Sequence, residues 1–121
     1  MRYYIYEMDT LMSSLECHCD TVLKKLFPEY KFVRIRPEWL KNMELDFYCS
    51  ELKLAVQCHG MQHYHFPNSI HQNISEWFAL LTQDDLKARL CSQVGIKLIS
   101  IPSAVNTLAL VESFIRYRVE R

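Results

Sequence analysis

The sequence is short of the residues that interrupt regular structure. Its 121 residues include two glycines, Gly60 and Gly95, and four prolines, with no low-complexity linker and no repeat. A chain of this length is close to the commonest size of one domain. The scarcity of structure-breaking residues therefore predicts a single domain spanning residues 1–121.

An excess of either charge is also missing, because 14 basic and 14 acidic side chains give a net charge of zero. A protein that holds nucleic acid by charge alone is usually basic, so this balance argues against a nucleic-acid coat protein. Any nucleic-acid contact must come from a local cluster of side chains or from a bound metal ion, which adds positive charge at its site.

No stretch approaches the roughly 18 apolar residues of a membrane span, and residues 1–8 lack the apolar run of a signal peptide. The five cysteines are odd in number and show no spacing typical of a disulfide framework. They are typical of reduced thiols in an intracellular protein, cytoplasmic or nuclear. We therefore expect an intracellular protein with no membrane segment.

A zinc site is the alternative interpretation of the cysteines, taken together with three histidines, His59, His63 and His65. One residue separates Cys17 from Cys19, which is tighter than the usual C-x2-C pair of structural sites. On a helix this spacing points the two thiols to different sides. Small buried hydrophobic residues are the favoured interpretation of the cysteines.

Hydrophobic periodicity predicts helices and strands that follow one another along the chain. Helical spacing predicts a helix at residues 9–27, capped by Asp9 or Thr10, and alternation predicts a strand at residues 30–35. Two apolar runs, 44–49 and 54–59, flank a polar turn and predict a β-hairpin. The aromatic stretch of residues 3–6 is expected to be a packing strand or a dimer contact.

A second helix is expected to begin at a cap on Asn73 or Ser75 and to end near Gln93, before Gly95. A strand at 96–101 and a final helix capped by Thr107 follow. The helical crossover between the hairpin and the last strand favours parallel pairing. The expected fold class is α/β, with a small mixed β-sheet flanked by helices on both faces.

Asp46 lies inside the first hairpin strand between apolar residues, where an acidic side chain is costly unless it has a partner. Alternation places Asp46 and Tyr48 on one face, and Gln57 and His59 on one face of the next strand. If the turn places Asp46 opposite Gln57, their oxygen atoms and the Cys58 carbonyl form a patch of the ligands that Mg²⁺ prefers.

The helices add further polar side chains. Asp84 and Lys87 are i and i+3 neighbours, so Lys87 could reach a scissile phosphate or an attacking water. Glu16 offers a carboxylate from the first helix in the same way. The alternative interpretation is that Asp46 is a strand-edge residue and that Asp84 and Lys87 form an ordinary surface pair.

Three sequence blocks resemble the core of a restriction-endonuclease-like family found in giant viruses. Residues 44–64, ELDFYCSELKLAVQCHGMQHY, match the pattern D-F-Y…L-A-x-E-x-x-G-x-Q-H-Y, and residues 84–102 match D-x-x-K-x-x-x-C followed by G-I-x-L-I-x-I-P. Glu16 and Cys19 form the third block. The family belongs to the PD-(D/E)XK superfamily and is similar to the very short patch repair endonucleases, so the resemblance implies a restriction-endonuclease-like core.

The resemblance also implies roles for individual residues. Asp46 would be the central metal-binding acid, and Gln57 stands where the family has the glutamate that is the second metal ligand. His59 stands where the superfamily often has the catalytic lysine, which Lys87 would supply instead. Glu16 would orient the water at the metal.

The implied cofactor is Mg²⁺ or Mn²⁺, and its implied ligands are the Asp46, Gln57 and Glu16 side chains and the Cys58 carbonyl. Gln62 and His63 match the Q-H pair of the pattern, and we expect them with Asp84 at the rim of the site, where substrate binds.

The function implied by the resemblance is a metal-dependent endonuclease that acts on DNA rather than RNA, inside the host cell if the protein is viral. The neutral amide of Gln57 is a weaker Mg²⁺ ligand than a carboxylate, so two alternatives stay open. One is a catalytically inactive nucleic-acid-binding or assembly module on the same fold, and the other is a protein-interaction domain. By analogy with small nucleases, residues 108–119 could form a homodimer contact.

Overall fold

The β-hairpin that the sequence predicts forms the centre of a five-stranded sheet in a computed structural model of the protein. The structure describes residues 3–6, 13–58 and 74–120, with side chains from 13–58 and 82–120. The elements follow in the order β1 (Tyr3–Tyr6), α1 (Ser14–Leu26), β2 (Val33–Pro37), the 3-10 helix η1 (Glu38–Leu40), β3 (Leu45–Cys49), β4 (Leu54–Cys58), α2 (Ile74–Gln93), β5 (Lys97–Ile101) and α3 (Leu108–Val119).

The sheet is mixed, as the sequence predicts. Its strands lie in the order β1-β2-β3-β4-β5, and the first three pairings are antiparallel. β5 pairs in parallel with β4, with Leu54 opposite Lys97 and Cys58 opposite Ile101. The aromatic stretch Tyr3–Tyr6 is an edge strand on β2, which confirms its interpretation as a strand.

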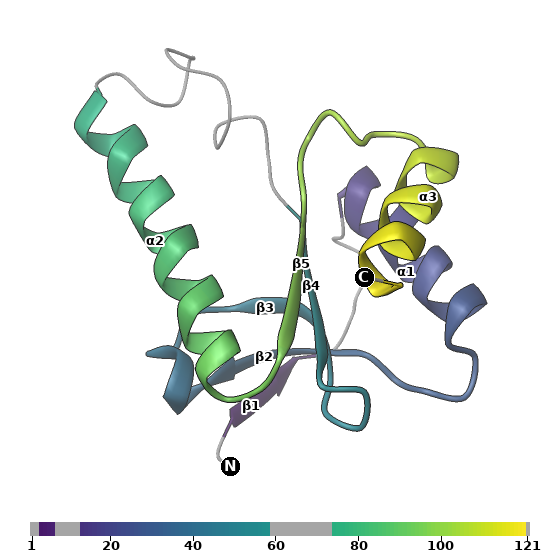
Figure 1. Ribbon diagram of the computed structural model, residues 1–121, viewed down its shortest axis with the longest axis horizontal. Coiled ribbons are helices and arrows are strands. Elements are labelled where there is room, and N and C mark those ends of the chain that lie inside the picture. The colour runs from purple at the N-terminus through teal and green to yellow at the C-terminus, as the bar shows by residue number, and fades with distance from the viewer. Residues whose placement is uncertain (1–2, 7–12, 59–73, 121) are drawn as a thin grey trace.

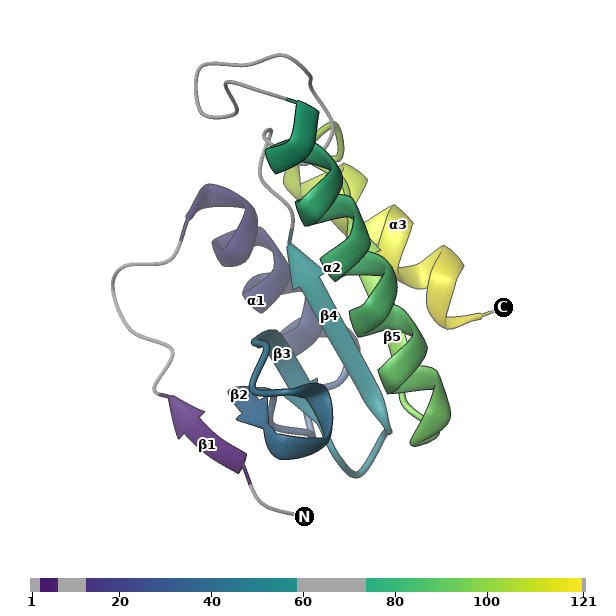
Figure 2. The ribbon, with the colours of Figure 1, turned by 90° about the vertical axis from the view of Figure 1, so that its left-hand side faces the viewer.

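Helices cover both faces of the sheet (Figure 1), as expected for this α/β class. α1 and α3 lie side by side on one face, and their apolar residues pack with Phe47, Val56 and Ile99. α2 crosses the opposite face, which is turned toward the viewer in Figure 2, and packs through Cys91 over Tyr48 and Ala55. The sheet thus has an apolar cluster on each side.

Capping residues set the helix ends, and one predicted start is wrong. α1 begins after Ser13, whose side chain accepts from the Glu16 amide in a capping box, rather than after Asp9 or Thr10. Thr107 caps α3 as predicted. Gly95 follows α2 with φ +78°, a left-handed conformation that favours glycine.

The predicted strand at residues 30–35 is displaced, because it begins at Val33 and includes Pro37 as its last residue. Pro37 is tolerated at this strand end, although a proline in a strand interior would remove a ladder hydrogen bond. The η1 turn that follows has no counterpart in the sequence prediction.

β3 carries an extra residue relative to β2. Val33 is opposite Tyr48 and Ile35 is opposite Leu45, so two steps along β2 match three along β3. This is the signature of a β-bulge at residues 46–47. Leu45 and Tyr48 consequently pack in the same cluster under α2, and the regular alternation predicted through Asp46 is wrong.

Candidate functional site

The β3–β4 hairpin brings Asp46 and Gln57 together. Phe47 is opposite Val56, and the same register continued by one residue places Asp46 opposite Gln57. The Asp46 amide donates to Gln57 Oε1 at 3.4 Å, and the Cys58 amide donates to Asp46 Oδ2 at 2.9 Å. The predicted juxtaposition of the acid and the amide is therefore confirmed.

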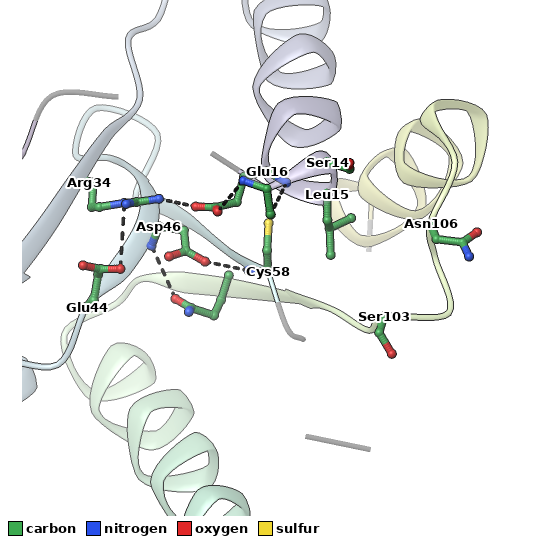
Figure 3. Close-up of a pocket in the computed structure, with 11 residues that line it drawn as sticks. Ser14, Leu15, Glu16, Arg34, Glu44, Asp46, Cys58, Ser103 and Asn106 are labelled. Atoms are coloured by element: carbon green, nitrogen blue, oxygen red, sulfur yellow. Dashed lines mark hydrogen bonds and ion pairs between the residues drawn. The ribbon is translucent and has the colours of Figure 1, made fainter. Parts of the chain in front are cut away.

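These side chains open onto a cavity of about 530 Å³ (Figure 3). It lies between the start of α1, the start of β3, the end of β4 and the segment before α3. Three carboxylates, Glu16, Glu44 and Asp46, line it together with the guanidinium of Arg34. The uncharged lining comes from Ser13, Ser14, Leu15, Gln57, Cys58, Ser103 and Asn106.

The α1 capping box holds Glu16 at the cavity. Glu16 Oε1 accepts from the Ser13 amide at 3.0 Å, and the Glu16 amide donates to Ser13 Oγ at 3.2 Å. The other carboxylate oxygen, Oε2, is paired with Arg34 Nη2. Figure 3 shows the Glu16 carboxylate between α1 and the Arg34 side chain, so both of its oxygens already have partners.

Sequence reasoning did not identify two charged residues of the cavity, Glu44 and Arg34. Arg34 is the positively charged one. It lies on β2 between Val33 and Ile35, whose partners on β3 stand on either side of the bulge. Its Nε is 3.8 Å from Glu44 Oε1. Arg36 contacts the other oxygen of Glu44 at 3.2 Å. The sequence did contain a signal for Arg34. Two arginines stand at alternate positions of an otherwise apolar strand, and alternate residues of a strand share a face.

Asp46 is a buried carboxylate with little compensation for its charge. It is 6% exposed, and burial raises its pKa to about 6, against the opposing hydrogen bond from the Cys58 amide. Glu16 raises the pKa further, and Arg34 lowers it. Among the described residues Asp46 forms no ion pair within 4 Å, so its charge would attract a cation.

Lys87 lies close enough to Asp46 to interact with its charge, but its ammonium group is already engaged. Nζ donates to the Glu44 backbone carbonyl at 2.7 Å. Burial lowers the Lys87 pKa, and the charges of Asp46 and Asp84 oppose that shift. Lys87 is not among the residues that line the cavity, and its expected reach toward a phosphate or an attacking water stays a prediction.

Asp84 is half-buried on α2, one turn before Lys87, and it contributes to the charge around that ammonium group. His59, expected at the catalytic position, and the rim residues Gln62 and His63 lie outside the described residues, as does His65. Their predicted roles stay predictions.

The cysteines confirm one part of the sequence analysis. Cys17 is exposed and Cys19 is buried, so their thiols point to different sides of α1. Cys19 Sγ lies 3.1 Å from Cys58 Sγ and links α1 to β4. This hydrogen bond and burial raise the Cys58 pKa, so Cys58 is a protonated thiol at neutral pH.

The donor atoms suit a hard divalent cation. Asp46, Glu16 and Gln57 present carboxylate and amide oxygens, the atoms that Mg²⁺ and Mn²⁺ prefer, and the buried charge of Asp46 lacks an ion-pair partner in the described structure. Within residues 13–58 and 82–120, however, no three His, Cys, Asp or Glu side chains form a preassembled metal-binding group. An ion held here would have to draw Glu16 toward Asp46.

The sequence is similar to uncharacterized viral proteins. It is 33% identical over 88 residues to the uncharacterized protein 307L of Invertebrate iridescent virus 6, covering 64% of this chain and 45% of that protein. It is 30% identical over 97 residues to the uncharacterized protein 033L of Invertebrate iridescent virus 3, covering 75% of this chain and 50% of that protein.

A third relative, the uncharacterized protein 094L of Frog virus 3 (isolate Goorha), is 30% identical over 83 residues. The match covers 68% of this chain and 52% of that protein. The chain spans about half the length of these curated relatives. No protein-family model and no solved structure matches it. In the described part of the chain, no helix is both long and apolar enough to cross a membrane.

Proposed function

We propose that this protein is a metal-dependent endonuclease that hydrolyses phosphodiester bonds in DNA, on a restriction-endonuclease-like core of the PD-(D/E)XK superfamily. The observation that carries the proposal is the Asp46 carboxylate. It is buried at a β-bulge, has no ion pair in the described structure, and lies in a cavity with Glu16 and Glu44. Such perturbed carboxylates in clefts are typical of functional sites.

In this proposal Asp46, Glu16 and Gln57 hold Mg²⁺ or Mn²⁺, with the Cys58 carbonyl as a further oxygen ligand. The ion, when bound, would activate a water and neutralise charge on the phosphate. The Cys58 amide fixes the orientation of Asp46 through its 2.9 Å hydrogen bond. His59 would take the proton of the attacking water, and Gln62 and His63 would contact the DNA at the rim.

The fold and the relatives support this proposal at a coarser level. A small mixed sheet with helices on both faces is the architecture that the resemblance implies. The similarity to viral proteins agrees with a resemblance to a giant-virus family, and it favours action inside an infected cell. A homodimer through α3 stays a proposal, which the exposed Leu108 and Leu110 favour.

A catalytically inactive nucleic-acid-binding module is the second candidate, and three features favour it. Gln57 lacks the charge of a carboxylate ligand. Glu16 is engaged by Arg34, and Lys87 is held by a backbone carbonyl. An inactive module would keep the fold and bind nucleic acid, but no metal ion would start a reaction.

A nuclease assay with a matched pair of variants tests the proposal. Asp46→Asn should lower Mn²⁺-dependent cleavage of supercoiled DNA by at least roughly a hundredfold, because it removes the central anionic ligand. Asp85→Asn makes the same change on the exposed face of α2 and should leave cleavage unchanged. Branched DNA and RNA assayed in parallel define the substrate.

Cutting that needs no divalent ion, or that survives Asp46→Asn, would show that the assigned chemistry is wrong. Wild-type protein that binds DNA but never cleaves it with Mg²⁺ or Mn²⁺ would instead support the inactive module.

A further inference from the structure

The cavity already contains a cation of its own. Arg34 contributes the positive charge among the described lining residues, against three carboxylates. It pairs with Glu16 through Nη2, but its Nε is buried without a hydrogen bond, at 3.8 Å from Glu44. A buried guanidinium donor left unpaired is unusual, so this position does not use the full bonding capacity of Arg34.

We propose that Arg34 is a resident counter-cation, which holds Glu16 while no divalent ion is bound and which a divalent ion must displace from Glu16. This inference rests on the proposed metal site and adds its regulation. In it, the affinity of the site for a metal ion is set by competition with a side chain of the same protein.

The bonding of Glu16 shows which contact would be given up. Oε1 accepts from the Ser13 amide and Oε2 from Arg34. The Ser13 bond belongs to the capping box that starts α1, and its loss would leave the amide of the N-cap residue without this partner. The contact with Arg34 has no such role in the backbone, so Oε2 is the oxygen that an incoming ion would take.

Arg34 also has a second carboxylate to move to. Glu44 lies on its other side at 3.8 Å, just beyond hydrogen-bond distance from Nε. A small shift of the guanidinium away from Glu16 would satisfy that Nε, while Arg36 retains the other Glu44 oxygen. Arg34 thus lies between two acceptors, and metal binding would move it from Glu16 toward Glu44.

Calorimetric titration with Mn²⁺ tests the competition directly. Arg34→Gln should bind Mn²⁺ roughly tenfold more tightly than the wild type, since it frees Glu16 from a partly buried ion pair. Arg36→Gln removes the same charge from the same strand but touches Glu44 instead, so it should change the affinity by less than about threefold. This control separates the Glu16 contact from a general loss of positive charge.

A second background makes the test specific to Glu16. In Glu16→Gln protein, which lacks the contested carboxylate, adding Arg34→Gln should give no further gain in Mn²⁺ affinity. If the wild type binds Mn²⁺ and Arg34→Gln binds it no more tightly, the inference is overturned and the metal site stands. If neither protein binds Mn²⁺, the proposed metal site itself is wrong, and the inference falls with it.

If Arg34→Gln fails to fold by circular dichroism, the wild type decides the question. Saturating Mg²⁺ should shift the Arg34 Nε–H signal in a nitrogen-15 spectrum and leave the Arg36 signal almost unchanged, with Arg34→Lys and Arg36→Lys used for assignment. An Arg34 signal that does not respond to bound Mg²⁺ would overturn the inference.

Discussion

The two ends of the β3–β4 hairpin differ sharply, although they belong to the same pair of strands. At the turn end, Cys49 pairs with Leu54 and Tyr48 with Ala55, and none is more than 5% exposed. At the open end, the neighbouring positions are Asp46 and a half-buried Gln57 at the cavity. The turn end is part of the core, whereas the open end holds polar groups at the price of burying a charge.

The bulge at residues 46–47 marks the boundary between these ends. It lets Leu45 and Tyr48 both pack under α2 while Asp46 reaches the cavity. Bulges re-aim side chains in this way and are enriched next to active sites. The comparison predicts that substitutions at the turn end change stability, and that substitutions at the open end change binding and pH dependence.

The largest effect is expected for Phe47, which is 1% exposed and packs in the cluster under α1 and α3. Phe47→Ala should lower the free energy of unfolding by about 3–5 kcal/mol, from lost burial and the cavity left behind. Phe114→Ala makes the same change at the half-buried margin of this cluster and should cost less than half as much. Equal losses in urea denaturation would contradict this account of the core.

Asp46→Asn should instead raise the free energy of unfolding at neutral pH. Because the folded-state pKa of Asp46 is raised from 3.8 to about 6, the protonated carboxyl stabilises the fold, and that stability is lost as the pH rises through about 6. The shift corresponds to about 3 kcal/mol. Asparagine cannot ionise, so at pH 7.5 the variant should unfold at a higher urea concentration than the wild type.

The difference between Asp46→Asn and the wild type should shrink below pH 4, where both side chains are neutral. A wild-type stability curve that is flat between pH 4 and pH 7, or that matches the Asp46→Asn curve throughout, would show that the buried charge is compensated.

Much of the fold was predictable because the relevant signals are local. The sequence predicted a second helix from a cap at Asn73 or Ser75 to about Gln93, before Gly95, and the observed α2 is Ile74–Gln93. Crossover length predicted the parallel pairing of β5. The start of α1 was misplaced because apolar periodicity extends past the true cap, and only the capping box of Ser13 and Glu16 fixes the first turn.

The site was predictable only in part, because its contacts join distant segments. Hairpin register was enough to place Asp46 beside Gln57. The pairing of Arg34 with Glu16 depends on how α1 packs on the sheet. The bulge could not be predicted from alternation, because all five residues of β3 are buried. The strand therefore shows no regular change between buried and exposed positions that an extra residue would interrupt. The Lys87 contact with the Glu44 carbonyl could not be predicted because it joins α2 to the residue before β3.

A pair of cysteine-to-serine substitutions compares the two ends of the hairpin with a smaller change in side-chain size. Cys49→Ser puts a hydroxyl into a position that is 2% exposed at the dry turn end and should cost about 2 kcal/mol. Cys58→Ser places the same hydroxyl beside the cavity and next to the Cys19 thiol, where hydrogen bonding should keep the cost below about 1 kcal/mol. A larger loss of stability for Cys58→Ser in thermal unfolding would mean that a hydroxyl finds no better hydrogen bonding at the open end than at the turn end.

The smallest expected effect separates the two candidate functions. Gln57→Glu adds a carboxylate next to Asp46 and should raise Mn²⁺ affinity roughly tenfold, because ligand charge tunes the affinity for hard cations. Without metal, the two neighbouring anions repel, so the melting temperature at pH 7.5 should fall and should recover when Mn²⁺ is added. Gln83→Glu on the exposed surface of α2 is the matched control and should show neither change.

The same variant separates the two candidate functions by its activity. In an active nuclease, Gln57→Glu should also speed cleavage of DNA, and Asp46→Asn in the same chain should remove that gain. In an inactive module, the added negative charge should weaken DNA binding and start no reaction. Calorimetry, thermal unfolding and the cleavage assay on one set of proteins distinguish these outcomes, and unchanged Mn²⁺ affinity in Gln57→Glu would mean that Gln57 is not a metal ligand.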